Sequence, residues 1–174
     1  MKSSPSNIYC LDASALITFH RYYPRTVLPD LWAELENLFK SRKAISHELV
    51  YSEIIPKTGP ADELGKWLKN LKPYFAPISS RQTQLLPDIL TNFPKLIDSE
   101  NKKEQADPWL IALIIEKMGA NNLFEENDSY IMVSAENENS TIKIPAACRY
   151  YKIQHMNLFK FFEVNGWKLS MTKT

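Results

Sequence analysis

Short apolar runs alternate along the chain with longer segments of helical character, and this alternation constrains the fold more than any other feature. The runs at 7–12, 43–45, 74–78 and 130–136 predict buried strands, and a last strand is expected at 153–157. Strands that alternate with helices form a mostly parallel sheet with helices on both faces. The sequence therefore predicts the α/β class.

The size and composition suit one globular domain. A chain of 174 residues can bury a sizeable core, and we expect residues 1–174 to form a single domain. The net charge is only +1, so the chain lacks the overall positive charge that many nucleic-acid-binding proteins carry. This argues mildly against tight, non-specific binding of long DNA or RNA, and it leaves room for an enzyme that binds one strand locally.

Several common sites and segments are missing from the sequence. Cys10 and Cys148 form neither a disulfide framework nor a CxxC zinc motif, and reduced buried thiols suit the cytoplasm. The opening MKSSPSN lacks the apolar core of a signal peptide, and no apolar run approaches the roughly 18 residues of a membrane span. The glycines cannot form a dinucleotide or P-loop motif. We expect a cytoplasmic protein without a membrane partner.

Capping signals mark two helices that bear on the site. Ser46 is the predicted N-cap of the helix after the second strand. The segment 107–119 is the clearest helix, with Asp107 as N-cap, Pro108 at the first helical position and Gly119 as C-cap. It is apolar on nearly all sides, so we expect it to be buried.

Four acidic residues stand beside apolar runs: Asp12, Glu53, Asp107 and Glu136. A carboxylate drawn toward an apolar interior is costly unless something neutralises it, and a divalent cation is one such partner. Asp12 and Glu136 each end a predicted strand, where ligands bind in open α/β sheets. Glu53 falls on the apolar face of its helix, where a glutamate requires a partner.

Each acid also has a structural interpretation. Asp12 can be a helix cap, and its position alone leaves the two interpretations about even. Asp107 before Pro108 is ordinary capping chemistry, which spacing alone favours by roughly two to one. Glu136 opens the polar stretch ENENS and can be a solvated loop residue.

Other candidates for catalysis are weaker. His20, His47 and His155 are scattered without metal-ligand spacing, so surface or packing roles are expected. No serine lies in a G-x-S-x-G context. The segment RYYPR mixes Arg21 and Arg25 with aromatic rings, which suits contact with a single strand, although a solvated helix end explains it equally well.

The order of these segments resembles the PIN-domain family, the fold of many toxin–antitoxin ribonucleases. LDASALI resembles its opening signature, with Asp12 followed by Ser14. AISHELVYSEI resembles the second signature, with Glu53 in the acidic position, and ADPWLIALII resembles the third, with Asp107. The order and spacing of the signatures together are more specific than any one of them.

YIMVSAE resembles the fourth signature, where the family usually has Thr-x-Asp and this chain has Ser134 and Glu136. The glutamate is longer by one methylene, which would move or loosen a second metal ion. The resemblance runs from Ile8 to Phe162, and KIPAACRYYKIQHMNLFKFF is similar to an uncharacterised prokaryotic PIN-like subfamily.

The resemblance implies a three-layer domain in which the four acids bind one or two Mg²⁺ or Mn²⁺ ions, supported by Ser14 and Ser134. The implied activity is that of a metal-dependent endoribonuclease, the toxin of a toxin–antitoxin pair. The implied partners are RNA, an antitoxin protein and a second copy of the chain. One alternative is a catalytically weak module that binds RNA or protein, favoured by Glu136. Another is a purely structural subunit in which the four acids do not converge.

Overall fold

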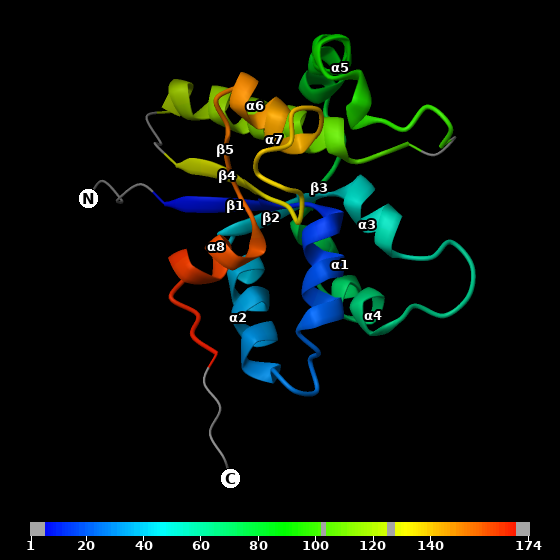
Figure 1. Cartoon of the computed structure of the whole chain (residues 1–174), viewed down its shortest axis with the longest axis vertical. Coiled ribbons are helices and arrows are strands. Elements are labelled where there is room, and N and C mark those ends of the chain that lie inside the picture. The colour runs from blue at the N-terminus through cyan, green and yellow to red at the C-terminus, as the bar shows by residue number, and fades with distance from the viewer. Residues whose placement is uncertain (1–5, 102–103, 125–127, 170–174) are drawn as a thin grey trace.

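Five parallel strands form the centre of the fold, in the order β3-β2-β1-β4-β5 (Figure 1). The computed structural model describes residues 6–101, 104–124 and 128–169. The strands are β1 (Asn7–Leu11), β2 (Ala44–His47), β3 (Phe75–Ala76), β4 (Ser129–Val133) and β5 (Gln154–Met156). The predicted α/β class is confirmed, and the sheet is parallel throughout.

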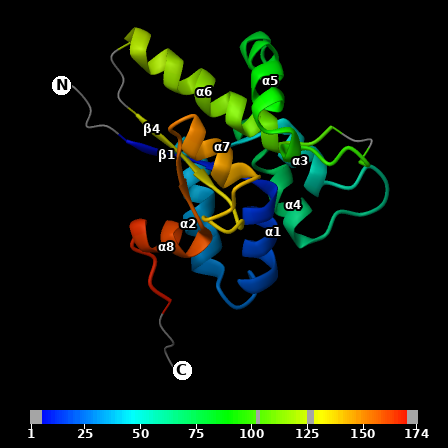
Figure 2. The ribbon, with the colours of Figure 1, turned by 45° about the horizontal axis from the view of Figure 1, so that its top comes forward.

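In the described residues, eight helices surround this sheet. In Figure 1, α5, α6 and α7 lie above it and α1, α2 and α8 lie below it, and the turned view in Figure 2 agrees. The helices are α1 (Ala13–Tyr22), α2 (Pro29–Lys40), α3 (Glu48–Ile54), α4 (Glu63–Lys69), α5 (Ser80–Asn92), α6 (Asp107–Phe124), α7 (Ile144–Tyr150) and α8 (Leu158–Val164). Short 3-10 turns span Lys72–Tyr74 and Pro94–Leu96. The arrangement has three layers, as expected for a parallel sheet.

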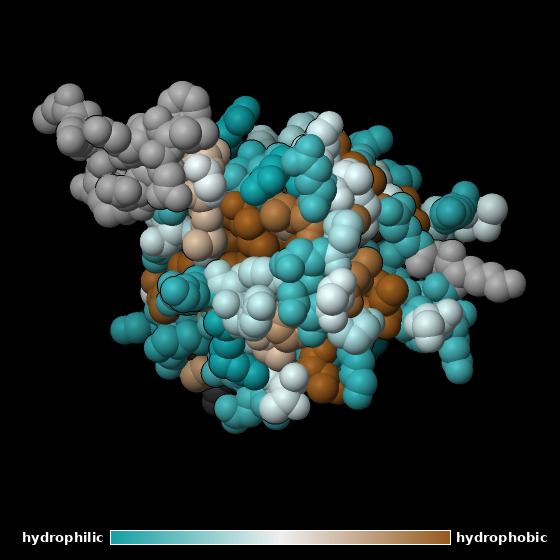
Figure 3. Space-filling view, turned by 90° about the horizontal axis from the view of Figure 1, so that it is seen from above, coloured by the Kyte–Doolittle hydropathy of each residue, from teal (hydrophilic) through white to brown (hydrophobic). Residues whose placement is uncertain are grey.

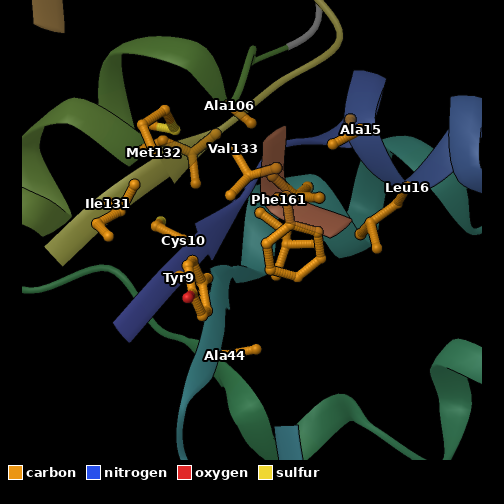
Figure 4. Packing of buried hydrophobic residues seen from close by; sticks show 14 of the residues in the cluster. Tyr9, Cys10, Ala15, Leu16, Ala44, Ala106, Ile131, Met132, Val133 and Phe161 are labelled. Carbon is orange, nitrogen blue, oxygen red and sulfur yellow. The ribbon is translucent and has the colours of Figure 1, made fainter. Parts of the chain in front are cut away.

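The core lies on both faces of β1 and β4. Cys10 is fully buried, and Tyr9 meets the ring of Phe161 edge to face with 4.8 Å between centroids (Figure 4). On the opposite face, residues 110–114 of α6 are completely buried, as predicted from their apolar composition. Burial on both faces explains why these strands are continuous apolar runs instead of alternating patterns.

The outer surface mixes both kinds of side chain. Figure 3 shows apolar side chains in separate groups between polar ones on the face above α5, α6 and α7. Within the ranges that the structure covers, none of the helices has both the length and the apolar composition of a membrane span.

The parallel register brings the ends of β1 and β4 together. Leu11 pairs with Val133, and the backbone N–H of Asp12 donates to the Val133 carbonyl at 3.0 Å. The N-terminus of β1 lies at the left of Figure 1 and α1 leaves its other end at the right. The residues that follow the strands therefore meet at one edge of the sheet, which we call the carboxyl edge.

The expected cap at Ser46 is wrong by one residue. β2 continues to His47, whose Nδ1 accepts the Leu49 N–H at 3.2 Å and so caps α3. Ser46 is still in the strand, and its hydroxyl donates to the Leu11 carbonyl at 2.6 Å. The Ser46 hydroxyl is bound to the neighbouring strand, and the next residue, His47, caps the helix instead.

Two expectations for α6 also need correction. Asp107 is the first residue of the helix and not the residue before it. The helix does not end at Gly119 but continues to Phe124, and Gly119 is not among the glycines with positive φ. A C-capping glycine needs the left-handed conformation. Gly119 is therefore an interior helical residue.

Candidate active site

The four acidic residues lie on, or shortly after, four different elements. Asp12 follows β1, Glu53 is on α3, Asp107 begins α6 and Glu136 follows β4. Burial raises the pKa of Glu53, Asp107 and Glu136, and the charge of Asp12 adds to the rise in each, while Glu53 and Glu136 also add to that of Asp107. The structure therefore places Glu53, Asp107 and Glu136 near enough to Asp12 for their charges to interact.

Asp12 is both a helix cap and a buried acid. It is 3% exposed, and its Oδ2 accepts hydrogen bonds from the Ser14 N–H at 3.2 Å and the Ser14 hydroxyl at 2.5 Å. Burial raises the pKa of Asp12, and the hydrogen bonds from Ser14 oppose this. Asp12 can therefore cap the helix and also act as a metal ligand, because both hydrogen bonds from Ser14 go to the same carboxylate oxygen, Oδ2.

Two serines hold the loop after β4 in place. The Ser14 hydroxyl accepts the Ala135 N–H at 3.0 Å, which joins this loop to the start of α1. The hydroxyl of Ser134, fully buried, accepts the Glu136 N–H at 3.3 Å and lies 2.8 Å from Nε2 of His155 on β5. The backbone that carries Glu136 is therefore fixed to both β5 and α1.

The long side chain of Glu53 brings its carboxylate close to the start of α6. The residue as a whole is exposed, so it does not lie on the buried face of α3 as the sequence suggested. Its carboxylate turns inward, however, and Oε1 accepts the Ala106 N–H at 2.8 Å, next to Asp107. Desolvation of this carboxylate raises the pKa of Glu53 despite that hydrogen bond.

Asp107 is strongly biased toward its protonated form. Burial raises its pKa from 3.8 to about 8, and the negative charges of Asp12, Glu136 and Glu53 add to the effect. In the absence of a cation, Asp107 therefore retains its proton near neutral pH. Carboxyl groups that cannot all ionise together are typical of a site that holds a cation or a shared proton.

Glu136 has a buried carboxylate oxygen, Oε2, without a hydrogen-bond partner in the described residues. Its Oε1 lies 3.9 Å from Nζ of Lys143, and burial raises the pKa of Glu136 while Lys143 opposes the rise. A buried carboxylate oxygen without a partner is costly and favours a bound cation or donor.

The donor set fits a hard divalent cation. Four carboxylates offer only oxygen ligands, which Mg²⁺ and Mn²⁺ prefer, and a cation would relieve both their repulsion and the deficit at Glu136 Oε2. In the described parts of the chain, no three acidic, histidine or cysteine side chains already stand in a metal-binding arrangement. The site is thus a gathering of repelling acids and not a preformed ligand cage.

The two arginines do not join this site. Arg21 is exposed in the last turn of α1, and Asp12 is the N-cap of the same helix, so about 14 Å of helix separates them. Arg25 lies near Glu36 of α2, whose pKa is lowered mainly by a hydrogen bond from Lys40 and to a smaller extent by the charge of Arg25. Their predicted role as substrate contacts gains no support from this placement.

Two further residues, His47 and Lys143, have contacts that the sequence pattern does not predict in detail. His47 is buried and stacks on Trp109, with its Nε2 3.1 Å from Gln82 Oε1, so its expected packing role is confirmed. Burial lowers the pKa of His47, which keeps the ring neutral. Sequence reasoning missed Lys143, which precedes α7. Its side chain approaches Glu136 across a loop, and no spacing pattern in the sequence predicts such a contact.

Comparison with known proteins places the chain in one family. The chain belongs to the family described as a domain of unknown function, DUF4411, whose model matches residues 9–169 and so includes all four acids. Searches of curated proteins and of solved structures gave no match.

Proposed function

We propose that the protein is a Mg²⁺- or Mn²⁺-dependent endoribonuclease of the cytoplasm. The observation that carries this proposal is the convergence of four carboxylates whose pKa values rise together at one sheet edge, with the unpartnered Glu136 Oε2 among them. Asp12, Glu53, Asp107 and Glu136 would hold the cation. When bound, it supplies an activated water and stabilises the leaving oxygen of a phosphodiester.

The chain's own residues prepare this site. Ser14 orients Asp12 and ties it to the loop after β4, while Ser134 fixes the backbone at Glu136. Asp107 must lose its proton before it can act as a ligand, because only a carboxylate binds a cation well. We expect metal binding to strengthen as pH rises toward about 8.

The substrate class and the partners are inferred by resemblance. The four signatures resemble those of toxin-type PIN domains, which favours RNA as the substrate, an antitoxin protein as the controlling partner and self-association of the chain. The net charge of +1 favours contact with a short stretch of RNA over tight binding along a long one.

A second candidate is a catalytically weak module of the same fold that binds RNA or a protein. Two observations favour it: the chain has Glu136 where aspartate is usual in the resembling family, and no ready-made ligand cage is present in the described residues. In this case the acids would bind a cation or a basic partner without cleaving a phosphodiester.

A cleavage assay separates the two candidates. A panel of single-stranded and structured RNAs is incubated with wild type, Asp107→Asn and Glu163→Gln in Mn²⁺, Mg²⁺ or EDTA. Glu163 is an exposed acid on α8 and serves as the control. We expect wild type and Glu163→Gln to cleave only with metal and Asp107→Asn to be inactive. RNA binding without cleavage would favour the second candidate, and equal cleavage by all three proteins would exclude this site.

A further inference from the structure

The loop between β4 and α7 makes hydrogen bonds within itself and to α7. Arg149 donates from Nη1 to the Glu138 carbonyl at 2.7 Å and from Nη2 to the Ser140 carbonyl. Asn137 accepts the Asn139 N–H on its side chain and the Ser140 N–H on its carbonyl, both at 2.9 Å. These hydrogen bonds tie the first half of the loop, residues 137–140, to α7.

Lys143 stands at the far end of this loop and faces the acids. Its Nζ lies 3.9 Å from Glu136 Oε1, and its side chain is 54% exposed while that of Glu136 is 18% exposed. Burial raises the pKa of both Asp12 and Asp107, and the positive charge of Lys143 opposes part of that rise. One half-exposed cation thus offsets part of the charge of three acids from the rim of the site.

This geometry gives Lys143 two competing partners. An ammonium on a flexible stem can change partners with little rearrangement. A divalent cation among the acids would compete with Lys143 for Glu136 and repel its charge. An RNA phosphate, in turn, has to approach a group of carboxylates that repels it, and a cation at the rim is the complementary contact.

We propose that Lys143 is a resident counter-ion that exchanges partners, pairing with Glu136 before metal binds and with an RNA phosphate afterwards. The inference rests on the proposed function and adds a substrate-binding residue to it. It predicts opposite effects on the two ligands, because removal of the lysine frees Glu136 for the metal and removes a contact to the RNA.

Lys160 provides a matched control. Its side chain is 56% exposed and pairs with Glu163 at 3.1 Å on α8, so it resembles Lys143 in exposure and in having an acidic partner. The test uses Lys143→Gln, Lys143→Arg and Lys160→Gln in the full chain. Calorimetry measures binding of Mn²⁺ alone, and fluorescence anisotropy measures binding of a labelled oligouridine in Ca²⁺ over a range of salt concentrations.

We expect Lys143→Gln to bind Mn²⁺ about two- to fivefold more tightly than wild type, the range of a partly exposed ion pair. We expect it to bind the oligouridine more weakly. Loss of one phosphate contact should also make the slope of log affinity against log salt concentration shallower by about 0.7. Lys143→Arg should retain the RNA affinity and its salt slope, and Lys160→Gln should match wild type in both assays.

The outcomes distinguish this inference from the proposed function. If wild type binds Mn²⁺ but Lys143→Gln behaves like wild type with both ligands, the counter-ion role is wrong and the metal site stands. Either effect without the other overturns the exchange of partners. If wild type binds no Mn²⁺, the proposed function fails and the inference fails with it.

Discussion

At the scale of single residues, the site is built from side chains that serve the fold and the acidic group together. Asp12 caps α1 through Ser14 and still contributes charge to its neighbours. Glu53 accepts the Ala106 N–H and raises the pKa of Asp107. These contacts do not remove the repulsion between the acids. Replacing one acid should therefore leave the metal-free protein as stable as before or more stable, and should weaken metal binding.

Asp12→Asn tests this directly. Asparagine caps a helix about as well as aspartate, and the change removes one buried negative charge. We expect a melting temperature equal to or above that of wild type, and a smaller gain in melting temperature with Mn²⁺. Asp62→Asn, at the cap of α4, is the control and should keep the full metal effect. Equal metal effects in Asp12→Asn and wild type would exclude Asp12 as a ligand.

Asp107 predicts a pH dependence of stability. Its pKa is raised from 3.8 to about 8, so the folded protein retains a proton that the unfolded chain has already lost. The metal-free protein should therefore lose stability as pH rises between these two values, by an amount on the order of a few kcal/mol.

Denaturant unfolding of wild type and Asp107→Asn across this pH range measures that loss. The difference in unfolding free energy between the two proteins should move in favour of the variant as pH rises, because asparagine does not ionise. A difference that is constant with pH would show that Asp107 has an ordinary pKa.

At the scale of elements, α6 does most to position the site. It is buried along residues 110–114 and begins with Asp107, so the packing of the helix sets the place of this acid. A network beneath it, in which Gln82 donates to Glu116 at 2.7 Å and contacts His47, joins α5 and α6 to β2.

Gly119 offers a test of how α6 is built. A Cβ at this interior helical position would meet no atom within 4 Å other than the adjoining backbone of its own helix. We expect Gly119→Ala to raise the free energy of unfolding by about 0.5–1 kcal/mol. Gly166→Ala should lower it, because Gly166 has a φ of 69° that strains alanine. Destabilisation by Gly119→Ala in denaturant unfolding would restore the C-cap assignment.

At the scale of the whole molecule, the parallel sheet explains why acids so far apart in sequence meet. Every strand ends at the same edge, so Asp12 and Glu136 become neighbours through the pairing of Leu11 with Val133. This much could be predicted from the alternation of apolar runs and helices. The pairing order of the strands and the contacts across loops could not, because they depend on packing between distant segments.

The errors have particular physical causes. Serine caps helices well, which makes Ser46 the predicted cap, but its hydroxyl donates to the Leu11 carbonyl instead. Gly119 was expected to end α6, yet the helix continues through it. Lys143 carried no signal at all, since its contact with Glu136 depends on the shape of the loop between them.

The central claim is that the four acids share a divalent cation. The most direct measurement is a crystal structure of the chain soaked in Mn²⁺, with anomalous scattering recorded at the manganese edge. We expect an anomalous peak within about 2.0–2.6 Å of oxygens from Asp12, Asp107 and at least one of Glu53 and Glu136. A structure with fully occupied Mn²⁺ elsewhere and none among these carboxylates would contradict the account.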